Sequence, residues 1–541
     1  MPDNDSDNAK LAQQLVREYE TLKADRASVE SDWRDIAEYI FPRRIFEGDS
    51  AAEDRYTKIY NSTGRRGLIR LASAIMGLMT NPAIKWFGLR HIDDRENEQR
   101  QAREDLQWAQ NQAMNVFAAP SSGAALALME FFLDCAGFGT GVVFGRPNAA
   151  GGPTTMFETR TLAECCVRAG RGGKPDAVYR RFDMTVREAI DQFGEQAMAD
   201  LPGDLAKKPD HKLSILHAVY PRQPRKSKSK LAKDKPYASV YVLQNPKRVL
   251  REGGFDQFRY IVARWSKVSG EVYGDGPGAA VLPEVLMVNM MEQTVIEAAQ
   301  LAVAPPLQMP HQGYMSPPMF EPRAINYYQA GAEGRIEPIH TNSQPILGDE
   351  VIRRREERID EGFFLDFFEL PLLDRMTATE VMQRRQDKQA LLAPVVTRLQ
   401  QELLGPMIRL VLRDLAATGR IAKWIVDADS EDQLQIDYFG PLAISQKASE
   451  WLSIQQWLMA MAPVAEQMPE VADNLAGDEY AAYTHGIFNV PLQLLRKTKD
   501  RDAIRAQRRR SMEAQAGAAQ AQTMARAAKD AASAQKELAL G

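Results

Sequence analysis

The first stretch of the sequence that could carry chemistry is a glycine-rich run, Gly137-Phe138-Gly139-Thr140-Gly141. Alternating glycines are typical of phosphate-binding loops, but in dinucleotide-binding proteins they follow a strand and open a helix. Here the predicted order is the reverse, because a helix over 124–136 precedes the run and a strand over 142–144 follows it. We therefore expect a tight helix-to-strand turn, with a nucleotide site as the alternative.

Other local signatures of catalysis are missing from the sequence. It contains no G-x-x-x-x-G-K-[ST] loop, no H-E-x-x-H and no G-x-S-x-G, and its six histidines are scattered. Cys165 and Cys166 are adjacent, which is not a metal-ligand spacing. We therefore expect no catalytic site, no metal site and no cofactor. An enzyme whose site residues lie far apart in sequence remains the alternative.

Two runs of basic residues could contact nucleic acid. Arg353-Arg354-Arg355 is followed directly by acidic residues up to Glu361, so ion pairs on a helix surface or between subunits are expected before phosphate contacts. The segment 496–510 has eight basic and two acidic residues, a net charge of +6. Its last three, Arg508, Arg509 and Arg510, are candidate contacts to DNA, since phosphate neutralisation needs no base sequence. A solvated helix face is the alternative.

Composition narrows the class of protein. The 541 residues suffice for roughly three or four domains, with 44% apolar and 26% charged residues and a formal net charge of −4. This charge argues against a protein that coats nucleic acid through bulk charge.

Three cysteines form no disulfide framework, so a reducing compartment is expected. The polar N-terminus predicts no signal peptide, and no uninterrupted apolar run reaches the ~18 residues of a membrane span.

Periodicity predicts the elements that must hold these residues. Two helical segments are expected over 9–41, a helix opening at 62–64, a charged helix over 93–118 and a strand over 86–89. Short strands and one helix, 185–194, predict an α+β region from 150 to 275. A long helix over 377–417 should kink or break at Pro394 and Pro406. Helices over 445–500 precede an Ala-rich tail, 501–541, which we expect to be frayed unless neighbours order it.

The chain is organised around a predicted helical hairpin. Helices over 279–303 and 349–370 flank a proline-rich excursion, and a turn over 371–376 leads into a third helix capped by Thr377 and Glu380. Apolar and aromatic side chains in the excursion must be buried against the next copy or a docked partner. The partner-contact candidates are Met309, Tyr314, Phe320, Tyr327 and Tyr328.

Several stretches together resemble the portal (head-to-tail connector) proteins of short-tailed, podovirus-type bacteriophages. No single stretch is specific to this family, but the order and spacing of the stretches over about 30–440 are specific. They are Trp33 to Pro42, Tyr60 to Arg66, Leu71 to Ser73, Asn81-Pro82 with Trp86-Phe87, Phe138 to Gly141, His217 to Arg222, Gly270 to Pro277 with Leu282-Pro283 and Asn289, Arg375 to Val381, and Glu402 to Pro406.

The resemblance implies a predominantly helical α+β portal fold with wing, stem, clip and crown, forming a ring of twelve subunits. The implied divisions are 1–275 wing (a helical N-terminal part plus an α+β part), 276–303 first stem helix, 304–347 clip, 348–370 second stem helix, 371–376 tunnel loop, 377–445 long kinked helix and return strand of the wing, 446–500 helical crown, and 501–541 Ala/Gln/Arg-rich tail or barrel.

The resemblance also implies a function without catalysis. The ring would sit in the virion at the head-tail vertex, after assembly in the host cytoplasm, as the channel for packaging and ejection of double-stranded DNA. Its partners would be the large terminase subunit, the tail adaptor, and capsid and scaffolding proteins, with no membrane. A tail adaptor or shell component without a channel is the alternative. The implied channel residues are Glu284, Glu292, Arg354 and Arg358 in the stem and Leu372, Leu373, Asp374 and Arg375 in the tunnel loop.

Overall fold

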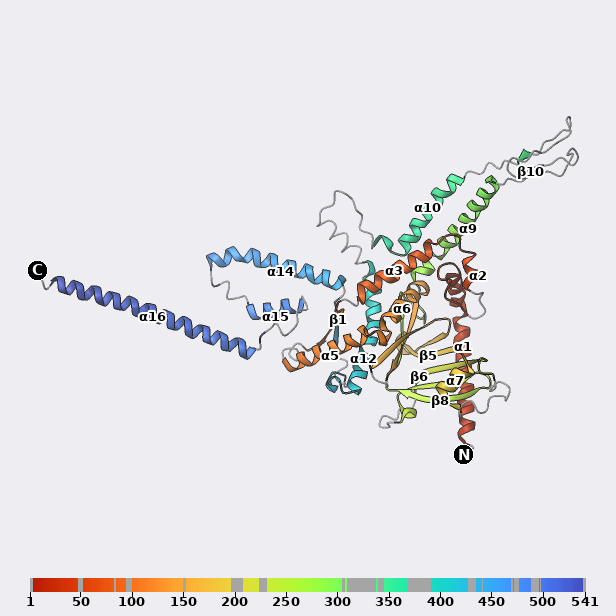
Figure 1. The fold of residues 1–541 in the computed structure, drawn as a ribbon, viewed down its shortest axis with the longest axis horizontal. Coiled ribbons are helices and arrows are strands. Elements are labelled where there is room, and N and C mark those ends of the chain that lie inside the picture. Colours follow the sequence, from red (N-terminus) through yellow and green to blue (C-terminus); the bar gives the residue numbers. More distant parts are fainter. Residues whose placement is uncertain are drawn as a thin grey trace. The chain divides into compact units, whose positions relative to one another are not determined.

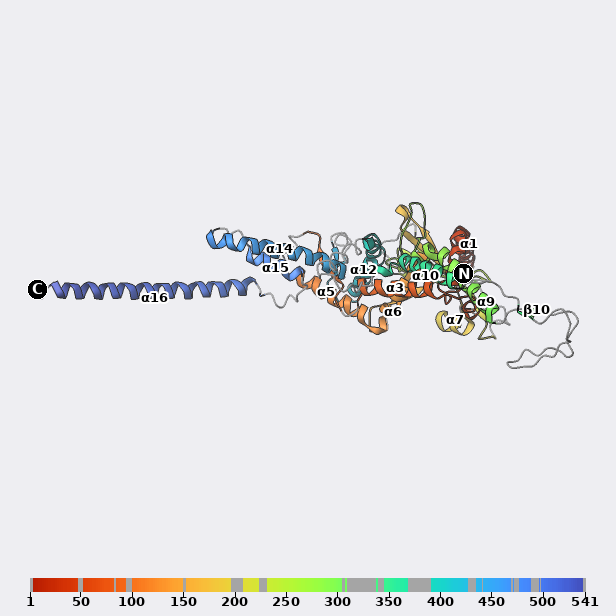
Figure 2. The ribbon, with the colours of Figure 1, turned by 90° about the horizontal axis from the view of Figure 1, so that it is seen from above.

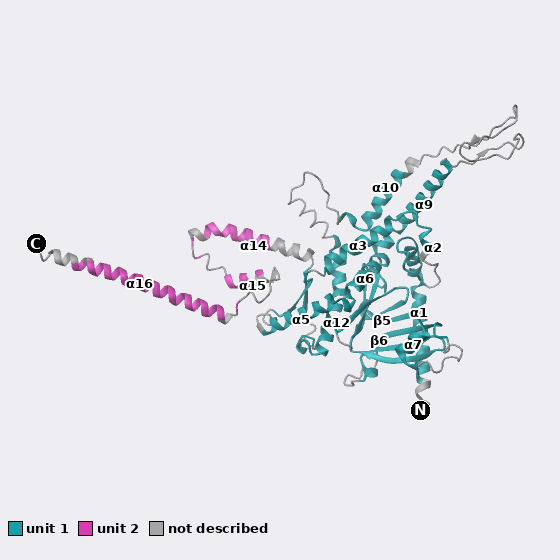
Figure 3. Cartoon of the chain, viewed as in Figure 1, with its two compact units in different colours: residues 1–442 teal, residues 443–541 magenta. Residues whose placement is uncertain are grey.

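The computed structural model of the chain separates into two compact units, 1–442 and 443–541, each described by itself (Figure 3). The described residues are 3–46, 52–81, 84–93, 100–148, 152–195, 208–222, 231–303, 307–308, 337–338, 345–367, 391–426, 434–439, 441–468, 470, 476–487, 496 and 498–538.

Helices make up much of the first unit (Figure 1). They are α1 (Asp3–Tyr39), α2 (Ala52–Tyr56), α3 (Thr63–Met79), α5 (Arg100–Ala118), α6 (Ala124–Phe138), α7 (Val186–Phe193), α9 (Pro277–Val303), α10 (Pro345–Gly362) and α12 (Gly405–Ala417). The prediction of two segments over 9–41 is wrong, because α1 is one helix. Its polar middle is held by Arg26, whose guanidinium is buried and bonded to Glu30 one turn later.

The strands of the first unit form antiparallel sheets. The larger has the order β4 (Cys165–Ala169), β5 (Pro175–Thr185), β6 (Lys212–Pro221), β7 (Tyr237–Leu243), β8 (Arg248–Phe255), and the smaller β3 (Thr155–Arg160), β2 (Thr140–Pro147), β9 (Tyr260–Arg264). Two-stranded pairs are β1 (Phe87–His91) with β12 (Leu434–Tyr438), and β10 (Leu307–Gln308) with β11 (Glu337–Pro338). The prediction of a mixed α+β chain is confirmed.

Apolar periodicity explains how helices cover the larger sheet. The start of α1 places Leu15, Val16 and Tyr19 in one buried cluster with residues of β4 to β7, and Figure 1 shows α1 running along that sheet. Helix α7 contributes Val186 and Ala189 to a separate cluster with β6 and β7. The Thr185 hydroxyl and Glu188 carboxylate form a capping box that starts α7.

A single large core joins the smaller sheet to α3, α5, α6, α9, α10 and α12. Helix α3 contacts both α6 and α10, and Figure 2 shows these three close together from above. Helix α9 lies beside α10 in an antiparallel pair that Figure 1 shows projecting from the rest of the unit. This pair corresponds to the predicted hairpin.

The second helix of the hairpin ends earlier than predicted. Helix α10 stops at Gly362 instead of continuing to 370, and Phe364 adopts a left-handed φ of 56°. The Phe363 amide still donates to the Ile359 carbonyl at 3.0 Å, so the chain leaves the helical path at Phe364. The Phe363 ring is fully buried and lies against Gly67 on α3.

The long helix after the turn is described from residue 391 onward. It does not break at Pro394 or Pro406, and a π-helical turn, Gln400–Leu404, precedes α12 instead. In this turn the Gly405 amide donates to the Gln400 carbonyl. The wide turn absorbs the loss of the donor at Pro406, which has no N–H. The predicted end of this helix at residue 417 is confirmed, with Thr418 as C-cap and Gly419 at φ 71°.

The second unit contains α14 (Pro441–Gln467), α15 (Gly477–Ile487) and α16 (Thr498–Leu538). Helix α16 overturns the expectation of a frayed tail, since 41 consecutive residues are helical. Alanine, glutamine, lysine and arginine have high helix propensity, which accounts for the helix without a large apolar face. The side chains described between 502 and 532 are almost all exposed.

Candidate functional site: the α9–α10 hairpin and its base

The two hairpin helices share an apolar seam. Val281, Val285 and Val288 of α9 are buried in the same cluster as Ile352 and Ile359 of α10. Their spacing of three, four and seven residues places each set on one helix face. The seam fixes the rotation of both helices, and so decides which side chains point away from the pair.

Polar contacts between the helices lie beside this seam. The Arg355 guanidinium donates to the Glu284 carboxylate at 2.7 Å, and Arg358 lies 3.6 Å from the same carboxylate. Arg354 instead binds Glu350 on its own helix, at 2.5 Å and in an exposed place. Three of the four predicted channel residues of the stem are therefore engaged in ion pairs within the chain.

Asn289 attaches α9 to the segment before α3. Its side-chain oxygen accepts from the amides of Tyr60 (2.7 Å) and Asn61 (3.3 Å), and its nitrogen donates to the Lys58 carbonyl (2.9 Å). A buried asparagine in an apolar helix is costly unless paired, and here both of its polar atoms are bonded. Asn289 thus holds residues 58–61 against the hairpin.

Glu356 provides the corresponding contact from α10. One carboxylate oxygen accepts from Asn61 Nδ2 (2.8 Å) and from Thr63 Oγ1 (2.9 Å). Asn61 Nδ2 also lies 3.4 Å from Glu292, the fourth predicted channel residue of the stem. The start of α3 is therefore bonded to both hairpin helices at once.

Glycines permit the close approach of helices at this base. A Cβ on Gly64 would lie 2.8 Å from the Val285 side chain, and one on Gly67 would lie 2.4 Å from the Phe363 ring. Distances under 3.0 Å require a neighbour to shift. Both glycines lie on α3, so this helix presents bare backbone to α9 and to the end of α10.

The loop leading into α9 is packed on the glycine-rich run. Gly139 has φ 76° and closes α6 before β2, which confirms the tight-turn interpretation. A Cβ on Gly274 or Gly276 would clash with the Gly139 backbone, at 2.5 and 2.7 Å respectively. The Gly274 amide also donates to Thr140 Oγ1 at 2.8 Å.

Aromatic residues of α1 and the same loop complete the base. Trp33 donates from Nε1 to the Phe138 carbonyl at 3.1 Å and packs edge-on against the Tyr273 ring. The Tyr273 hydroxyl accepts from the Val167 amide at 3.0 Å, and burial raises the pKa of Tyr273. Motifs from 33–42, 138–141 and 270–277 thus meet where α9 begins.

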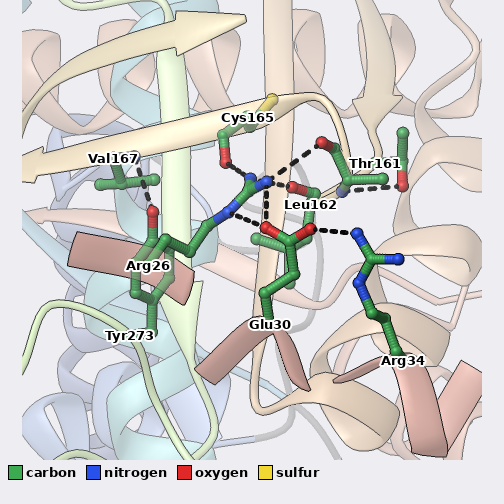
Figure 4. A network of polar contacts seen from close by, with 9 residues as sticks. Arg26, Glu30, Arg34, Thr161, Leu162, Cys165, Val167 and Tyr273 are labelled. Carbon is green, nitrogen blue, oxygen red and sulfur yellow. Dashed lines mark hydrogen bonds and ion pairs between the residues drawn. The ribbon is translucent and has the colours of Figure 1, made fainter. Parts of the chain in front are cut away.

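A buried arginine network anchors α1 beside them (Figure 4). Arg26 donates to the carbonyls of Leu162 (2.7 Å) and Cys165 (2.8 Å) and to the Glu30 carboxylate, which Arg34 also binds at 2.8 Å. Burial alone would raise the pKa of Glu30, but the two guanidinium groups hold it below its usual value. The network ties α1 to the loop before β4.

The π-helical turn is held by a second buried arginine. Arg264 lies at the end of β9 and binds both carboxylate oxygens of Glu402, with Nε 3.0 Å from one and Nη2 2.8 Å from the other. The backbone amide of Arg264 also donates to the Glu402 carboxylate. The Tyr438 hydroxyl donates to the Gln400 carbonyl at 2.9 Å. The π-helical turn inside the long helix is therefore fixed from two strands.

The remaining predicted site residues fall into two groups. Arg508, Arg509 and Arg510 lie on α16 and are exposed, while Arg501 and Arg505 of the same helix bind Asp478 of α15. The tunnel-loop and clip candidates lie outside the described residues. They are Leu372, Leu373, Asp374, Arg375, Met309, Tyr314, Phe320, Tyr327 and Tyr328.

Helix α9 is also the one helix in the described part of the chain that could cross a membrane by length and composition. A stretch of 18 residues within 277–301 reaches a mean hydropathy of 1.2, and 28% of that stretch is buried. The segment passes on average composition, although Glu284, Asn289, Glu292 and Glu297 leave it without an uninterrupted apolar run of the length expected for a membrane span. Two of the polar side chains in α9, Glu284 and Asn289, bind protein groups.

No group of three or more His, Cys, Asp or Glu side chains within the described residues could hold a metal ion. The residues that sequence reasoning missed are Asn61, Thr63, Glu356 and Arg264, since their partners are at least 138 residues away. An asparagine inside the apolar α9 was the one local signal of such contacts.

Comparison with known proteins places this geometry in context. The chain matches the family described as bacteriophage head to tail connecting protein over residues 12–495, well beyond the 30–440 of the resemblance. It is 27% identical to the probable portal protein of Bordetella phage BPP-1 (91% of this chain, 90% of the relative) and 26% identical to the portal protein of Salmonella phage epsilon15 (95% and 94%). It is 23% identical to the portal protein of Escherichia phage T7 (74% of each).

Proposed function

The chain belongs to the bacteriophage head to tail connecting protein family, and from this premise we propose that it is the portal protein of a phage. The observation that carries the proposal is that relatives named portal protein align over nine tenths or more of both chains. The protein would form an oligomeric ring at one capsid vertex, where it connects head and tail and provides the channel for the viral DNA.

The hairpin geometry supports a ring. A ring with head-to-tail contacts needs a rigid element that each copy presents to the next in the same way. Helices α9 and α10 meet this need, since their base is fixed by Asn289 and Glu356. About twelve such helices, each ~10 Å across, make a circle about 120 Å round with a hole of roughly 28 Å, wide enough for duplex DNA.

The outer face of α9 supports contact with another copy. Met287, Met290 and Leu301 are exposed in this chain and follow one stripe opposite the buried valines. A stripe of this kind on a projecting helix must be covered in the working assembly. We assign it to the neighbouring subunit and not to a lipid bilayer, because α10, paired with α9 along the hairpin, has an exposed face rich in charged residues.

The channel would favour movement of DNA over binding. The segments 279–303 and 349–361 together have nine acidic residues and four arginines, a net charge of −5. Each phosphate neutralised by Lys or Arg adds affinity that must be broken for the DNA to move. In this proposal Leu372, Leu373, Asp374 and Arg375 form the constriction, where arginines grip phosphates weakly and leucines narrow the bore.

The constriction is tested by deleting residues 372–375. Capsids assembled with the deleted protein should take up DNA but lose it sooner than capsids with the full chain, as measured by nuclease-protected DNA over time. Equal retention by the two kinds of capsid would remove the tunnel loop from the proposal while leaving the ring intact.

The segment between the hairpin helices would be the docking surface for partners. We assign to 304–347 the contacts to the large terminase subunit during packaging and to the tail adaptor afterwards. Replacing Tyr327 and Tyr328 with Ser should leave rings intact but weaken binding of both partners. Failure of the variant to form rings, with folded subunits, would instead make this segment an intersubunit element.

The other regions follow the same plan. Residues 1–275 and 377–445 would form the wing, which contacts capsid and scaffolding proteins, and 446–500 the crown. Arg508, Arg509 and Arg510 would contact packaged DNA from the tail. The ring would act without catalysis, so purified protein should hydrolyse no ATP above background. Turnover that persists through repurification would favour a motor.

A further inference from the structure

The hairpin of α9 and α10 is attached to the rest of the first unit at two levels. At its root, Gly276 lies on the backbone of Gly139, since an added Cβ would come within 2.7 Å of the Gly139 amide nitrogen. The second attachment is Asn289, which lies about 18 Å along α9 from Pro277 and binds residues 58–61. Two attachments this far apart fix the direction in which the hairpin leaves the unit.

Asn61 joins the second attachment to both hairpin helices. Its Oδ1 accepts from the Thr63 amide at 2.8 Å, at the start of α3. Its Nδ2 donates to Glu356 of α10 at 2.8 Å and lies 3.4 Å from Glu292 of α9. Its backbone amide donates to the Asn289 side chain at 3.3 Å. One small residue therefore ties α3, α9 and α10 together.

The number of subunits in a closed ring depends on a small angle. Each copy is rotated relative to the next by about 30° in a ring of twelve, about 33° in a ring of eleven and about 28° in a ring of thirteen. A change of about 2.5° in this angle therefore adds or removes one copy.

The second attachment is sensitive to a rotation of this size. Turning the hairpin by about 2.5° about its root would move side chains that lie 18 Å from the root by about 0.8 Å. That movement would stretch the 2.8 Å bond between Asn61 and Glu356 to about 3.6 Å, beyond the range of a hydrogen bond. The contacts of Asn61 are therefore tight enough to distinguish neighbouring ring sizes.

We propose that Asn61 is a positioning residue that sets the number of subunits in the ring, because it fixes the direction of the hairpin relative to the rest of the first unit. The inference rests on the proposed function, which supplies the ring. A ring closes only when the hairpins and the remainder of the subunits require the same rotation between copies. A hairpin that could turn by a few degrees would let the same chain close with one copy more or fewer.

Two variants change the second attachment in different ways. Asn61→Asp keeps the size of the side chain and its acceptor oxygen, but it replaces the donor nitrogen with an oxygen that the Glu292 and Glu356 carboxylates repel. Gly64→Ala pushes α9 away from α3, because its Cβ would lie 2.8 Å from the Val285 side chain. A shift of about 0.6 Å at Val285, about 12 Å from the root, turns the hairpin by about 3°, the equivalent of one copy.

Each variant has a control with the same chemical change. Gln192→Glu also turns an amide into a carboxylate, on the exposed side of α7. Gly77→Ala also adds a methyl group to α3, at a place where an added Cβ would meet no atom of the described residues within 4 Å.

Native mass spectrometry of rings formed by the full chain measures the subunit number in steps of 60.6 kDa. We expect Asn61→Asp to lower the share of rings with the wild-type number at least about twofold, in favour of rings one copy larger or smaller. Gly64→Ala should instead move the most abundant ring size by one copy without broadening the distribution. Both controls should match the wild-type chain.

An unchanged distribution of ring sizes in Asn61→Asp would overturn the inference, as would an equal change in Gln192→Glu. Folded Asn61→Asp subunits that form no ring would overturn it too, because Asn61 would then be needed for closure itself and not for its number. If Asn61→Asp does not fold, a ring size of Gly64→Ala equal to that of Gly77→Ala overturns it. Absence of rings from the wild-type chain would instead contradict the proposed function.

Discussion

The Glu284 carboxylate on α9 lies 2.7 Å from the Arg355 guanidinium on α10. The contact joins the two hairpin helices, and each side chain is about a quarter exposed. A pair this exposed is screened by solvent, so we expect a coupling of only about 0.5–1 kcal/mol. A double-mutant cycle with Glu284→Gln and Arg355→Met, measured by urea unfolding at low salt, checks it. Purely additive effects of the two substitutions would show that the pair adds nothing.

The same contact changes how the charge of the channel should be tested. Reversing the charge of Glu284 or Glu292 would disturb the base of the hairpin as well as the electrostatic potential of the channel wall. Glu284 binds Arg355, and Glu292 lies near Asn61. The side chains of Glu357 and Glu361 are exposed on α10 and make no hydrogen bond or ion pair in the described part of the chain. Charge reversal there is the cleaner probe of DNA movement.

The hydrogen bonds of Asn289 to residues 58–61 predict a larger effect on stability. An Asn289→Leu substitution keeps the volume but leaves the amides of Tyr60 and Asn61 and the Lys58 carbonyl without this partner. We expect the free energy of unfolding to fall by about 2 kcal/mol. Gln293→Leu on the exposed side of the same helix should change it by less than about 0.5 kcal/mol. An equal loss in the free energy of unfolding from the two variants would show that the hydrogen bonds of Asn289 add no specific stability.

His217 predicts an acid-sensitive core. Its ring lies 3.0 Å from both the Tyr260 and Ser239 hydroxyls and stacks on Tyr241, and burial lowers its pKa to about 3. The unfolded chain therefore binds a proton between pH 6.5 and 3 that the folded chain does not. The stability from this neutral ring is complete above about pH 6.5 and is lost as the pH falls.

Urea unfolding at two pH values measures that effect. Between pH 7 and pH 5, His217 should lower the free energy of unfolding by about 2 kcal/mol. A His217→Gln variant is expected to be less stable at pH 7 but to show a pH dependence smaller by that amount. An unchanged pH dependence would mean that other groups cause the acid sensitivity.

Local periodicity predicted most of the fold. Helices α3, α6 and α7 and strands β2, β5 and β6 were predictable because their own apolar spacing specifies them. Strand β8 was missed, since Gly253 and Gly254 interrupt its alternation and its pairing partner is β7. The end of α10 was missed because a left-handed conformation at a phenylalanine, Phe364, has no local signal in the sequence.

The candidate site was predictable only as a segment. The sequence indicated a hairpin and its charges, but not that Glu284 and Glu356 would bind Arg355 and Asn61. Such pairs join separate elements, and neither partner shows it locally. The family resemblance identified the stretches around Tyr60, Phe138 and Gly270 without a physical reason. The structure provides one, because the stretches around Phe138 and Gly270 pack together where α9 begins and Tyr60 is bonded to Asn289 in the middle of that helix.

The exposed arginines of α16 predict a salt-dependent contact with DNA. Replacing Arg508, Arg509 and Arg510 with Gln should reduce the slope of log K against log salt by up to about 2.7 for duplex DNA. The matched control replaces Arg501 and Arg505, which already bind Asp478. Binding by fluorescence anisotropy at several salt concentrations measures both. A larger loss in the control than in the triple variant would place the DNA contact elsewhere.

The central claim is that copies of this chain assemble into a ring with an axial channel. Electron microscopy of the purified protein, with classification of end-on views, tests it most directly. We predict closed rings of about twelve 60.6 kDa chains with a central hole wide enough for duplex DNA. Single subunits at all protein concentrations, or closed particles without a hole, would contradict it.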